Sequence, residues 1–323
     1  MDPDRGAERP DVAAGSPPHG FADTAETRRL LRSRPPERAL SWAARQLGAP
    51  IVSARALCGG MSSAVHQLTV AGTDAGPGRS VVVLRRYVRP ELNAEEPDLA
   101  EREARALQVA AGIALATPEL LAVDPNGADA GVPSVLMSCL SGRVDWRPAE
   151  LERWLGRLAE LLPPIHGVDL PPPGVLPAYT PYRPDSDAPP ALSSGPRVWE
   201  RAVELAHGPP PDDRPVVVHR DFHPGNVLWR RGKVSGLVDW QAASVGPGSV
   251  DVGHCRVNLL RFGLDAAEAF TRHRERLTGP TYDPWADVVA VVGFLDGLRD
   301  DPGTDAHLFE TLLARATVDL DRP

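Results

Sequence analysis

Hydrophobic and polar positions divide the chain into a strand-rich first part and a helix-rich second part. Runs rich in valine and leucine, which predict strands, lie at 51–57, 64–70, 80–88, 119–123 and 133–137. Between the third and fourth runs, Leu99, Leu107 and Ala110 recur at helical spacing and predict a helix over 97–111. This order of elements predicts a small α+β unit rather than a parallel array of βαβ units.

Two features precede these strands. A helix is expected over 36–44, because Pro36 stands at its start, Glu37 lies in its first turn and Gly48 follows its end. Residues 1–22 are rich in proline, glycine, alanine and charge, so we expect a disordered tail there. The first lobe would then occupy residues 23–138.

The second part is predicted to be a mainly helical lobe over 139–323. A helix is expected over 149–162, since its leucines and Trp154 fall on one face. Residues 171–215 are rich in proline and predict a long loop that carries one helix near 198–206. Towards the carboxyl end, helical patterns alternate with proline and glycine breaks.

Charge and cysteine content narrow the compartment and the partners. The 323 residues carry a formal net charge of −8, which argues against nucleic acid as a main partner. The three cysteines are widely spaced and form no CxxC pair, which predicts free thiols in a reducing compartment. The most apolar stretch, 288–295, is far shorter than the ~20 residues that cross a bilayer. We therefore expect a cytoplasmic protein without a membrane partner, whose oligomeric state is unknown.

The most informative segment lies between two short apolar runs at 216–218 and 234–238. The first run leads into a polar loop that contains Asp221 and Asn226, and the second ends on Asp239. This order can bring the three side chains together at strand ends, where a ligand reaches them. Phosphoryl transfer requires a carboxylate that orients a hydroxyl and accepts its proton, and oxygen ligands for magnesium. The segment therefore predicts Asp221 as the base and Asn226 and Asp239 as ligands of Mg²⁺.

The loop sequence also resembles a known kinase signature. HRDFHPGNVL at 219–228 is similar to the HxDxHPGNxL motif of the aminoglycoside phosphotransferase-like family of small-molecule kinases. Asp239-Trp240 stands where protein kinases have Asp-Phe-Gly, and the missing glycine favours the small-molecule branch. The segment 246–253 resembles the family's downstream GxxxxDL, with valine in place of leucine.

This resemblance implies both a fold and an activity. The fold would be bilobal and protein-kinase-like, of the α+β class, with a small β-rich lobe and a larger, mainly helical lobe. The activity would be transfer of the γ-phosphate of ATP to a hydroxyl group of a small molecule, with Mg²⁺ as the metal.

The resemblance extends into the first lobe. The segment 82–86 resembles the family's nucleotide-anchoring strand, and strand alternation lets only one of Arg85 and Arg86 point into the cleft. We favour Arg85 as the phosphate anchor and expect Arg86 to face solvent. The next helix offers Glu101 and Glu103 as partners for the cation, and Glu103 matches the family's helix better.

Further contacts to the nucleotide are expected in two loops. Gly60 and Ser62 lie in a loop of small residues whose backbone N–H groups can cover the phosphates, although a plain hairpin turn is the alternative. Met137 and Cys139 lie at the expected hinge between the lobes, which the segment 139–142 resembles.

Other interpretations of the same residues stay open. His219, Asp221 and His223 could form a transition-metal site, but Pro224-Gly225 disfavours the helix that would align them. We expect His219 to hydrogen-bond the loop backbone near Asp221, and His223 to brace the loop. A non-catalytic ATP-binding module and a protein kinase are the remaining alternatives. The intact catalytic positions argue against the first, and the lack of Asp-Phe-Gly and Ala-Pro-Glu against the second.

The acceptor is not readable from the sequence. Acidic residues near the carboxyl end that could attract an aminoglycoside are Asp283, Asp287, Asp296, Asp300 and Asp301. They form no specificity pattern, so a macrolide, a sugar, an amino alcohol or another metabolite is equally open. Trp285, Asp287 and Asp296 are expected to pack in the core or to lie on a solvated helix face. His66 and His254 are expected to be ordinary structural or surface residues.

Overall fold

The computed structural model describes residues 24–57, 62–72, 80–190, 193–279, 282–300 and 306–321. The expected tail at 1–22 and Gly60 lie outside these ranges. The smaller lobe is built on a five-stranded antiparallel sheet in the order β1-β2-β3-β5-β4. Its strands are β1 (Ile51–Ala56), β2 (Ala64–Val70), β3 (Ser80–Arg86), β4 (Leu120–Asp124) and β5 (Ser134–Ser138).

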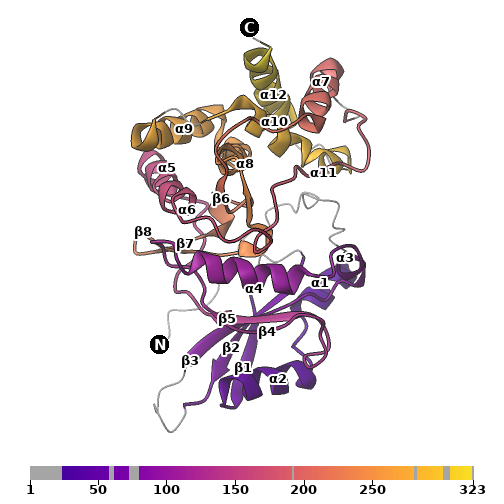
Figure 1. Ribbon diagram of the computed structural model, residues 1–323, viewed down its shortest axis with the longest axis vertical. Coiled ribbons are helices and arrows are strands. Elements are labelled where there is room, and N and C mark those ends of the chain that lie inside the picture. Colours follow the sequence, from indigo (N-terminus) through magenta and orange to yellow (C-terminus); the bar gives the residue numbers. More distant parts are fainter. Residues whose placement is uncertain are drawn as a thin grey trace, which may run out of the picture.

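Helices cover both faces of this sheet (Figure 1). The first helix, α1 (Ala25–Arg32), contacts β2. On the outer face, α2 (Glu37–Leu47) contacts β1. Trp42 of α2 packs there into a core with Leu68, Leu84 and Leu136. On the other face, α4 (Leu99–Ala110) packs against β4 and β5 and also contacts residues 240–242 of the larger lobe. A short helix that the sequence did not predict, α3 (Pro90–Glu95), links β3 to α4.

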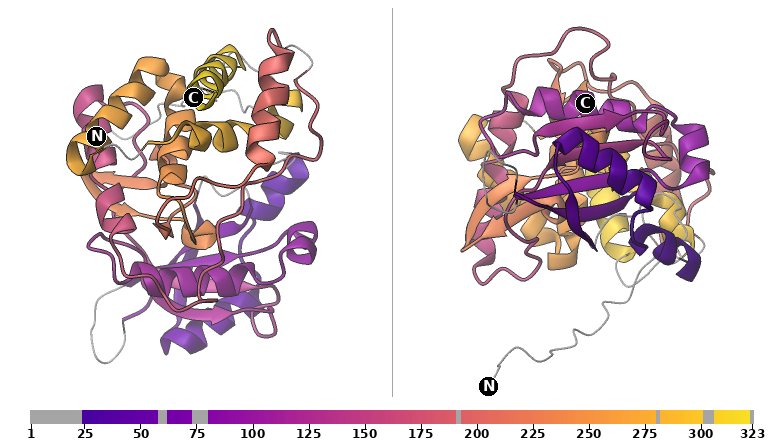
Figure 2. Two further views of the ribbon diagram at one scale, coloured as in Figure 1. Left: turned by 45° about the horizontal axis from the view of Figure 1, so that its top comes forward. Right: turned by 90° about the horizontal axis from the view of Figure 1, so that it is seen from below.

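The larger lobe is mainly helical, and its helices gather on the side of the sheet away from α2 (Figures 1 and 2). They are α5 (Leu151–Ala159), α6 (Leu162–His166), α7 (Pro196–His207), α8 (Ser249–Leu259), α9 (Leu264–Thr278), α10 (Pro284–Val292), α11 (Leu295–Asp300) and α12 (Ala306–Leu320). Two cores hold this lobe. One joins α5, α8 and α9 and continues into the smaller lobe through Leu107 and Met137. The other joins α7, α8, α10 and α12.

Two small antiparallel ribbons carry the loop that the sequence singled out. In one ribbon β6 (Val216–Val218) pairs with β9 (Ser244–Gly246), and in the other β7 (Val227–Arg230) pairs with β8 (Lys233–Leu237). The two predicted strands, β6 and β8, are therefore present, but they belong to different ribbons. The strands β7 and β9 were not predicted, because β7 begins within the motif segment 219–228 and β9 (Ser-Val-Gly) has only one strongly apolar residue.

The α+β architecture with a β-rich smaller lobe and a helical larger lobe agrees with the sequence-based prediction. The division of the chain at 138/139 stays a prediction. Among the described residues, no helix combines the length and apolar character that crossing a membrane requires. The cytoplasmic location also stays a prediction.

Candidate phosphotransfer site

A buried carboxylate shapes the turn that presents Asp221. Asp251, at the start of α8, is fully buried and accepts hydrogen bonds from the backbone N–H groups of His219 (3.0 Å) and Arg220 (2.7 Å). His166 contacts the same carboxylate through Nε2 at 2.9 Å. Arg220 has a positive φ of 68°, a conformation uncommon for residues other than glycine. The bonds to Asp251 therefore stabilise a strained turn directly before Asp221.

The carboxylate of Asp221 is held from both sides. Asn226 donates from Nδ2 to Asp221 Oδ2 at 2.9 Å and to its backbone oxygen at 2.8 Å. On the other side, Nε2 of His254 lies 3.0 Å from Oδ1 and Nε2 of His223 lies 3.7 Å from it. Burial alone would raise the pKa of Asp221, but the imidazoles of His223 and His254 hold it well below its usual range. Asp221 is thus ionised at neutral pH.

Asn226 and Asp239 are brought together by the backbone. The N–H of Val238 donates to the carbonyl oxygen of Asn226 at 3.0 Å, so Asp239 follows directly after this link. Asp239 has a positive φ of 71°. The amide nitrogen of Asn226 makes both bonds to Asp221, and the described residues provide no partner for its amide oxygen. One oxygen of Asn226 and the carboxylate of Asp239 therefore fit the donor set that Mg²⁺ prefers.

The His219 side chain bonds the backbone that follows β8 rather than the loop near Asp221. Its Nε2 lies 3.0 Å from the carbonyl oxygen of Val238, and its ring packs edge-on against Trp240, with centroids 4.6 Å apart. The expectation that this ring bonds the loop backbone near Asp221 was therefore wrong. The contact joins the two ribbons, because Val238 follows β8 and His219 follows β6.

Arg85 crosses from the smaller lobe to this loop. Its Nη1 lies 2.6 Å from Oε1 of Glu103 and 2.8 Å from Oδ1 of Asp239. Tyr87 donates to the second oxygen of Glu103 at 2.9 Å. Burial disfavours the charge on Arg85, but the carboxylates of Asp239 and Glu103 raise its pKa well above its ordinary value. For Glu103, burial is the largest effect and raises the pKa, although Arg85 and Tyr87 oppose it.

The two candidate arginines and the two candidate glutamates take different places. Arg86 points to the opposite face of β3 from Arg85 and is only 7% exposed, so the expectation that it faces solvent was wrong. The physical reason is that α2 covers this face of the sheet, where Trp42 packs with Leu84 and Arg86 lies near His66. Glu101 pairs with Arg105 on the surface of α4 at 2.5 Å. Glu103 is therefore the glutamate that contacts Arg85.

The remaining expected nucleotide contacts lie on the smaller lobe. Ser62 accepts a hydrogen bond from Nε2 of Gln241 at 3.4 Å, which links its loop to the larger lobe. Met137 is buried on β5 opposite Val83 of β3, and Cys139 is partly exposed at the end of the sheet. Nothing in these contacts identifies a ligand, so their role stays a prediction.

A sequence model described as "Phosphotransferase enzyme family" (APH) matches residues 53–288, which is more than half of the chain. The chain belongs to this phosphotransferase family. No curated protein matches it. A variant of a thermostable mutant of aminoglycoside phosphotransferase APH(4)-Ia, in a ternary complex with ADP and hygromycin B, is 18% identical, with a TM-score of 0.59 over 88% of this chain and 99% of that chain.

A second solved structure supports the same fold. The macrolide 2'-phosphotransferase MphH from Brachybacterium faecium is 16% identical, with a TM-score of 0.53 over 88% of this chain and 98% of that chain. Likeness at such low identity is evidence of fold alone. The predicted bilobal, kinase-like fold of this phosphotransferase is confirmed.

His254 is the residue at the site that the sequence reasoning missed. It lies on α8, three residues after Asp251, and its ring contacts the Asp221 carboxylate. It was expected to be an ordinary structural or surface residue. The available signal was its helical spacing from Asp251, because residues three apart share a helix face. Because Asp251 bonds the turn at His219 and Arg220, the same face of the helix also places His254 near that turn.

Distances alone would allow a metal ion at Asp221, His223 and His254, whose ligand atoms all lie within 4.8 Å of one another. The hydrogen bonds argue otherwise. Nδ1 of His223 accepts the N–H of Gly225 at 3.1 Å, so the neutral ring carries its proton on Nε2, which faces Asp221. A protonated nitrogen has no lone pair for a metal. Burial lowers the pKa of His223 to about 4, so the ring is neutral at physiological pH.

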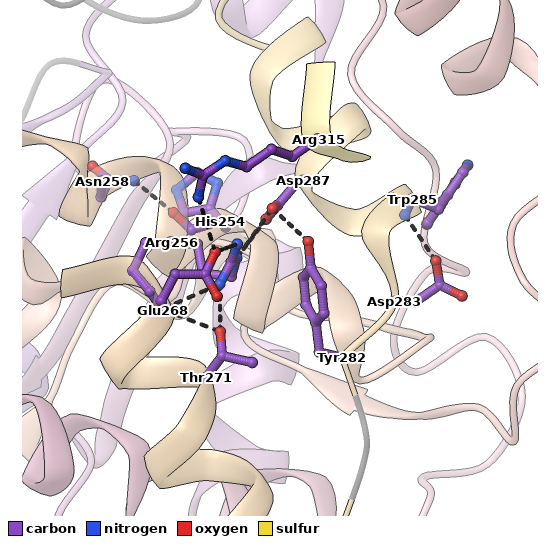
Figure 3. Close-up of polar contacts among 11 residues, drawn as sticks. His254, Arg256, Asn258, Glu268, Thr271, Tyr282, Asp283, Trp285, Asp287 and Arg315 are labelled. Atoms are coloured by element: carbon purple, nitrogen blue, oxygen red, sulfur yellow. Dashed lines mark hydrogen bonds and ion pairs between the residues drawn. The ribbon is translucent and has the colours of Figure 1, made fainter. Parts of the chain in front are cut away.

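The acidic residues near the carboxyl end mostly serve structure (Figure 3). Asp287 is fully buried and accepts from Nε of Arg256 at 2.9 Å and from Tyr282 at 2.6 Å. Asp283 caps α10 by accepting from the N–H of Trp285 at 2.8 Å. Asp296 accepts from the backbone N–H of Asp185 at 2.9 Å. Core packing is confirmed for Trp285 and Asp287, whereas Asp301 lies outside the described residues.

A pocket opens beside His254 in the larger lobe. Its enclosed volume is only about 20 Å³, and its lining includes Tyr179, Tyr182, Arg220, His254 and Phe294. None of the residues that line it is acidic. Since His254 contacts Asp221, this pocket adjoins the carboxylate expected to receive an acceptor hydroxyl.

Proposed function

We propose that this phosphotransferase transfers the γ-phosphate of ATP to a hydroxyl group of a small molecule. One observation carries the proposal. Asp239 contacts Arg85 of the smaller lobe through its side chain, while the residue before it bonds Asn226 of the loop that holds Asp221. These contacts bring a cation, two candidate metal ligands and a candidate base together where the lobes meet. Phosphoryl transfer requires this set of groups.

On the nucleotide side, Arg85 would bind phosphate oxygens while Glu103 keeps its side chain in place. In the structure Asp239 is the second anion that contacts Arg85, at 2.8 Å. A triphosphate would take over that contact, because its charge is larger and its oxygens can accept two guanidinium N–H bonds at once. The small-residue loop with Gly60 and Ser62 would lie over the phosphates, and Met137 and Cys139 would border the base.

Asn226 and Asp239 would hold Mg²⁺. The orientation of Asn226 supports this assignment, because both bonds from its amide nitrogen go to Asp221 and leave its oxygen for a cation. The chemistry that Mg²⁺ would supply here is neutralisation of the negative charge on the phosphate oxygens. Magnesium needs few protein ligands because it keeps several waters.

On the acceptor side, Asp221 would receive the hydrogen bond of the substrate hydroxyl. Asn226 holds one oxygen of its carboxylate and His254 the other, so the group cannot rotate away from the acceptor. Its low pKa keeps it ionised at neutral pH. A weak base suits phosphoryl transfer, since the transition state is loose and demands little help from the nucleophile.

The test is a pair of variants at Asp221. In Asp221→Ala, turnover of ATP with any acceptor found in a panel of hydroxylated compounds should fall by about 10²- to 10⁴-fold. The affinity for a non-hydrolysable ATP analogue with Mg²⁺, measured by calorimetry, should stay within a few-fold of the parent's. Asp221→Asn, which keeps the shape, should lose as much turnover as the alanine variant.

The matched control is Asp129→Ala, which removes an exposed carboxylate of the smaller lobe that pairs with Arg45. It should leave turnover and nucleotide affinity unchanged. Near-normal turnover in both Asp221 variants would overturn the proposed function.

A further inference from the structure

Arg220 lies on the acceptor side of the site without a carboxylate partner. Its Nη2 donates to the backbone oxygen of Thr180 at 2.7 Å. Its guanidinium carbon lies 4.0 Å from the ring centroid of Tyr182 and 5.5 Å from that of Tyr179. Within the described ranges, no Asp or Glu forms an ion pair with Arg220, and its buried Nε has no hydrogen-bond partner. The side chain thus keeps an unbalanced positive charge and an unused donor.

This charge borders the pocket beside the reacting end of the site. Arg220, Tyr179 and Tyr182 line it together with His254 and Phe294. The cationic face and the aromatic faces therefore meet in one concave surface. The enclosed part of this hollow is small, about 20 Å³, which is little more than the space of one water molecule. The hollow therefore admits one small group of a ligand, and the rest of that ligand would lie outside it.

The charge distribution selects against polycationic acceptors. An ammonium group entering the pocket would meet the guanidinium of Arg220 and no lining carboxylate. Of the acidic residues near the carboxyl end, Asp283, Asp287 and Asp296 are engaged in the bonds described above. An unpaired like charge is an effective device for rejecting the wrong ligand. An aminoglycoside is therefore a poor match to this surface.

We propose that the acceptor is a compact hydroxylated molecule with a flat apolar body and an anionic group. The anion pairs with Arg220, and the apolar body lies against the rings of Tyr182 and Phe294. The inference rests on the proposed function, because it takes Asp221 as the residue that receives the hydroxyl. In the reaction the acceptor oxygen bonds to the γ-phosphorus, the bond from that phosphorus to ADP breaks, and the hydroxyl proton passes to Asp221.

Three probes with the same ring and hydroxymethyl group test the charge preference. They are p-(hydroxymethyl)benzoate, which is anionic, p-(hydroxymethyl)benzamide, which is neutral, and p-(hydroxymethyl)benzylamine, which is cationic. Dissociation constants come from ligand-observed NMR titrations of the full chain. We expect the benzoate to bind about tenfold or more tightly than the amine, with the amide between them. Equal or tighter binding of the amine, or no saturable binding of any probe, overturns the proposal.

Variants of Arg220 assign the preference to this side chain. Arg220→Gln should bring the benzoate and the amide within about twofold of each other, whereas Arg220→Lys should keep the parent's order. Arg261→Gln is the matched control, because Arg261 also stacks on an aromatic ring, that of Trp146 at 4.3 Å, but does not line the pocket. An unchanged order in a folded Arg220→Gln variant contradicts the proposal. If that variant does not fold, the order measured with the parent chain decides.

Failure of this inference can be told apart from failure of the proposed function. Efficient phosphorylation of hygromycin B would leave the proposed function standing and overturn the anionic acceptor. A chain that neither binds Mg-ATP nor consumes it would overturn the proposed function. The order of the three probes would still be measurable by NMR in that chain.

Discussion

Two arginines face the site from opposite sides, and their surroundings differ. Arg85 lies between the carboxylates of Glu103 and Asp239, whereas Arg220 lies against the rings of Tyr179 and Tyr182 with no carboxylate partner in the described chain. The charge of Arg85 is thus balanced before any ligand arrives, so a phosphate must compete with Asp239 for it. The charge of Arg220 is not balanced. The comparison shows that the nucleotide side is organised in advance, while the acceptor side keeps a charge for its ligand.

The largest expected effect is on stability. Arg85→Ala leaves two carboxylates without their cation, and breaking a buried pair in this way costs about 3–5 kcal/mol of the free energy of unfolding. Arg220→Ala removes one hydrogen bond and two cation–π contacts and should cost about 1–2 kcal/mol. Urea unfolding of both variants measures the difference. Equal losses would mean that the two arginines are held by interactions of similar strength.

His223, three residues after Arg220, should make stability depend on pH. His223 has a pKa lowered by burial from 6.5 to about 4 in the folded chain. The unfolded chain therefore binds a proton first as the pH falls, so stability is full above about pH 6.5 and declines towards pH 4. The loss reaches at most about 3 kcal/mol.

His223→Gln checks this assignment, because it removes the titrating group and should flatten the decline. Urea midpoints of the parent and the variant, measured from pH 7 down to pH 4, give the comparison. A decline of the same size in the variant would assign the pH dependence to other groups.

The third effect concerns nucleotide binding on the Arg85 side. Glu103→Gln removes a charged acceptor from Arg85, and the affinity for Mg-ATP should fall by about tenfold. Glu101→Gln is the control, since Glu101 lies on the same helix and pairs with Arg105 at the surface. Arg220→Gln should also leave nucleotide affinity within about twofold, because its contacts lie in the other lobe. Calorimetry with a non-hydrolysable ATP analogue measures the nucleotide affinity of all three variants. An equal loss of nucleotide affinity in Glu101→Gln would mean that the effect comes from α4 as a whole and not from the bond between Glu103 and Arg85.

The smallest effect is expected on the acceptor side. Tyr182→Leu keeps apolar bulk but removes the nearer ring from Arg220, which should cost about 1 kcal/mol of stability. Binding of p-(hydroxymethyl)benzoate should weaken several-fold, while nucleotide affinity stays unchanged. NMR titration and calorimetry on the same preparation separate the two. Weaker nucleotide binding in this variant would show that the two sides are not independent.

The sequence predicted what lies close together along the chain. Asp221 and Asn226 are five residues apart, and Asp239 ends the next predicted strand, so a short segment was enough to place all three. Strand alternation also separated Arg85 from Arg86. It could not tell that α2 would cover the face on which Arg86 lies, because that depends on how the helix packs on the sheet.

The rest of the site comes from tertiary contacts that no local pattern encodes. His254 lies 33 residues after Asp221 in number but contacts its carboxylate at 3.0 Å. The strand β9 is three residues long and pairs with β6 on one side and with Ala178 on the other. The sequence also does not predict that Arg220 lacks a carboxylate partner. The acidic residues that might pair with it form bonds to other parts of the fold.

Helix α8 performs three unrelated tasks within two turns. Asp251 holds the turn before Asp221, His254 contacts its carboxylate, and Arg256 forms the core ion pair with Asp287 of α10 (Figure 3). Inserting or deleting a single residue here would rotate the three side chains by about 100° and disconnect all of them together. Sequence change that retunes the acceptor would therefore have to enter through the segment around Tyr179 and Tyr182 or through α10, where length and side chains can vary without misaligning the phosphate chemistry.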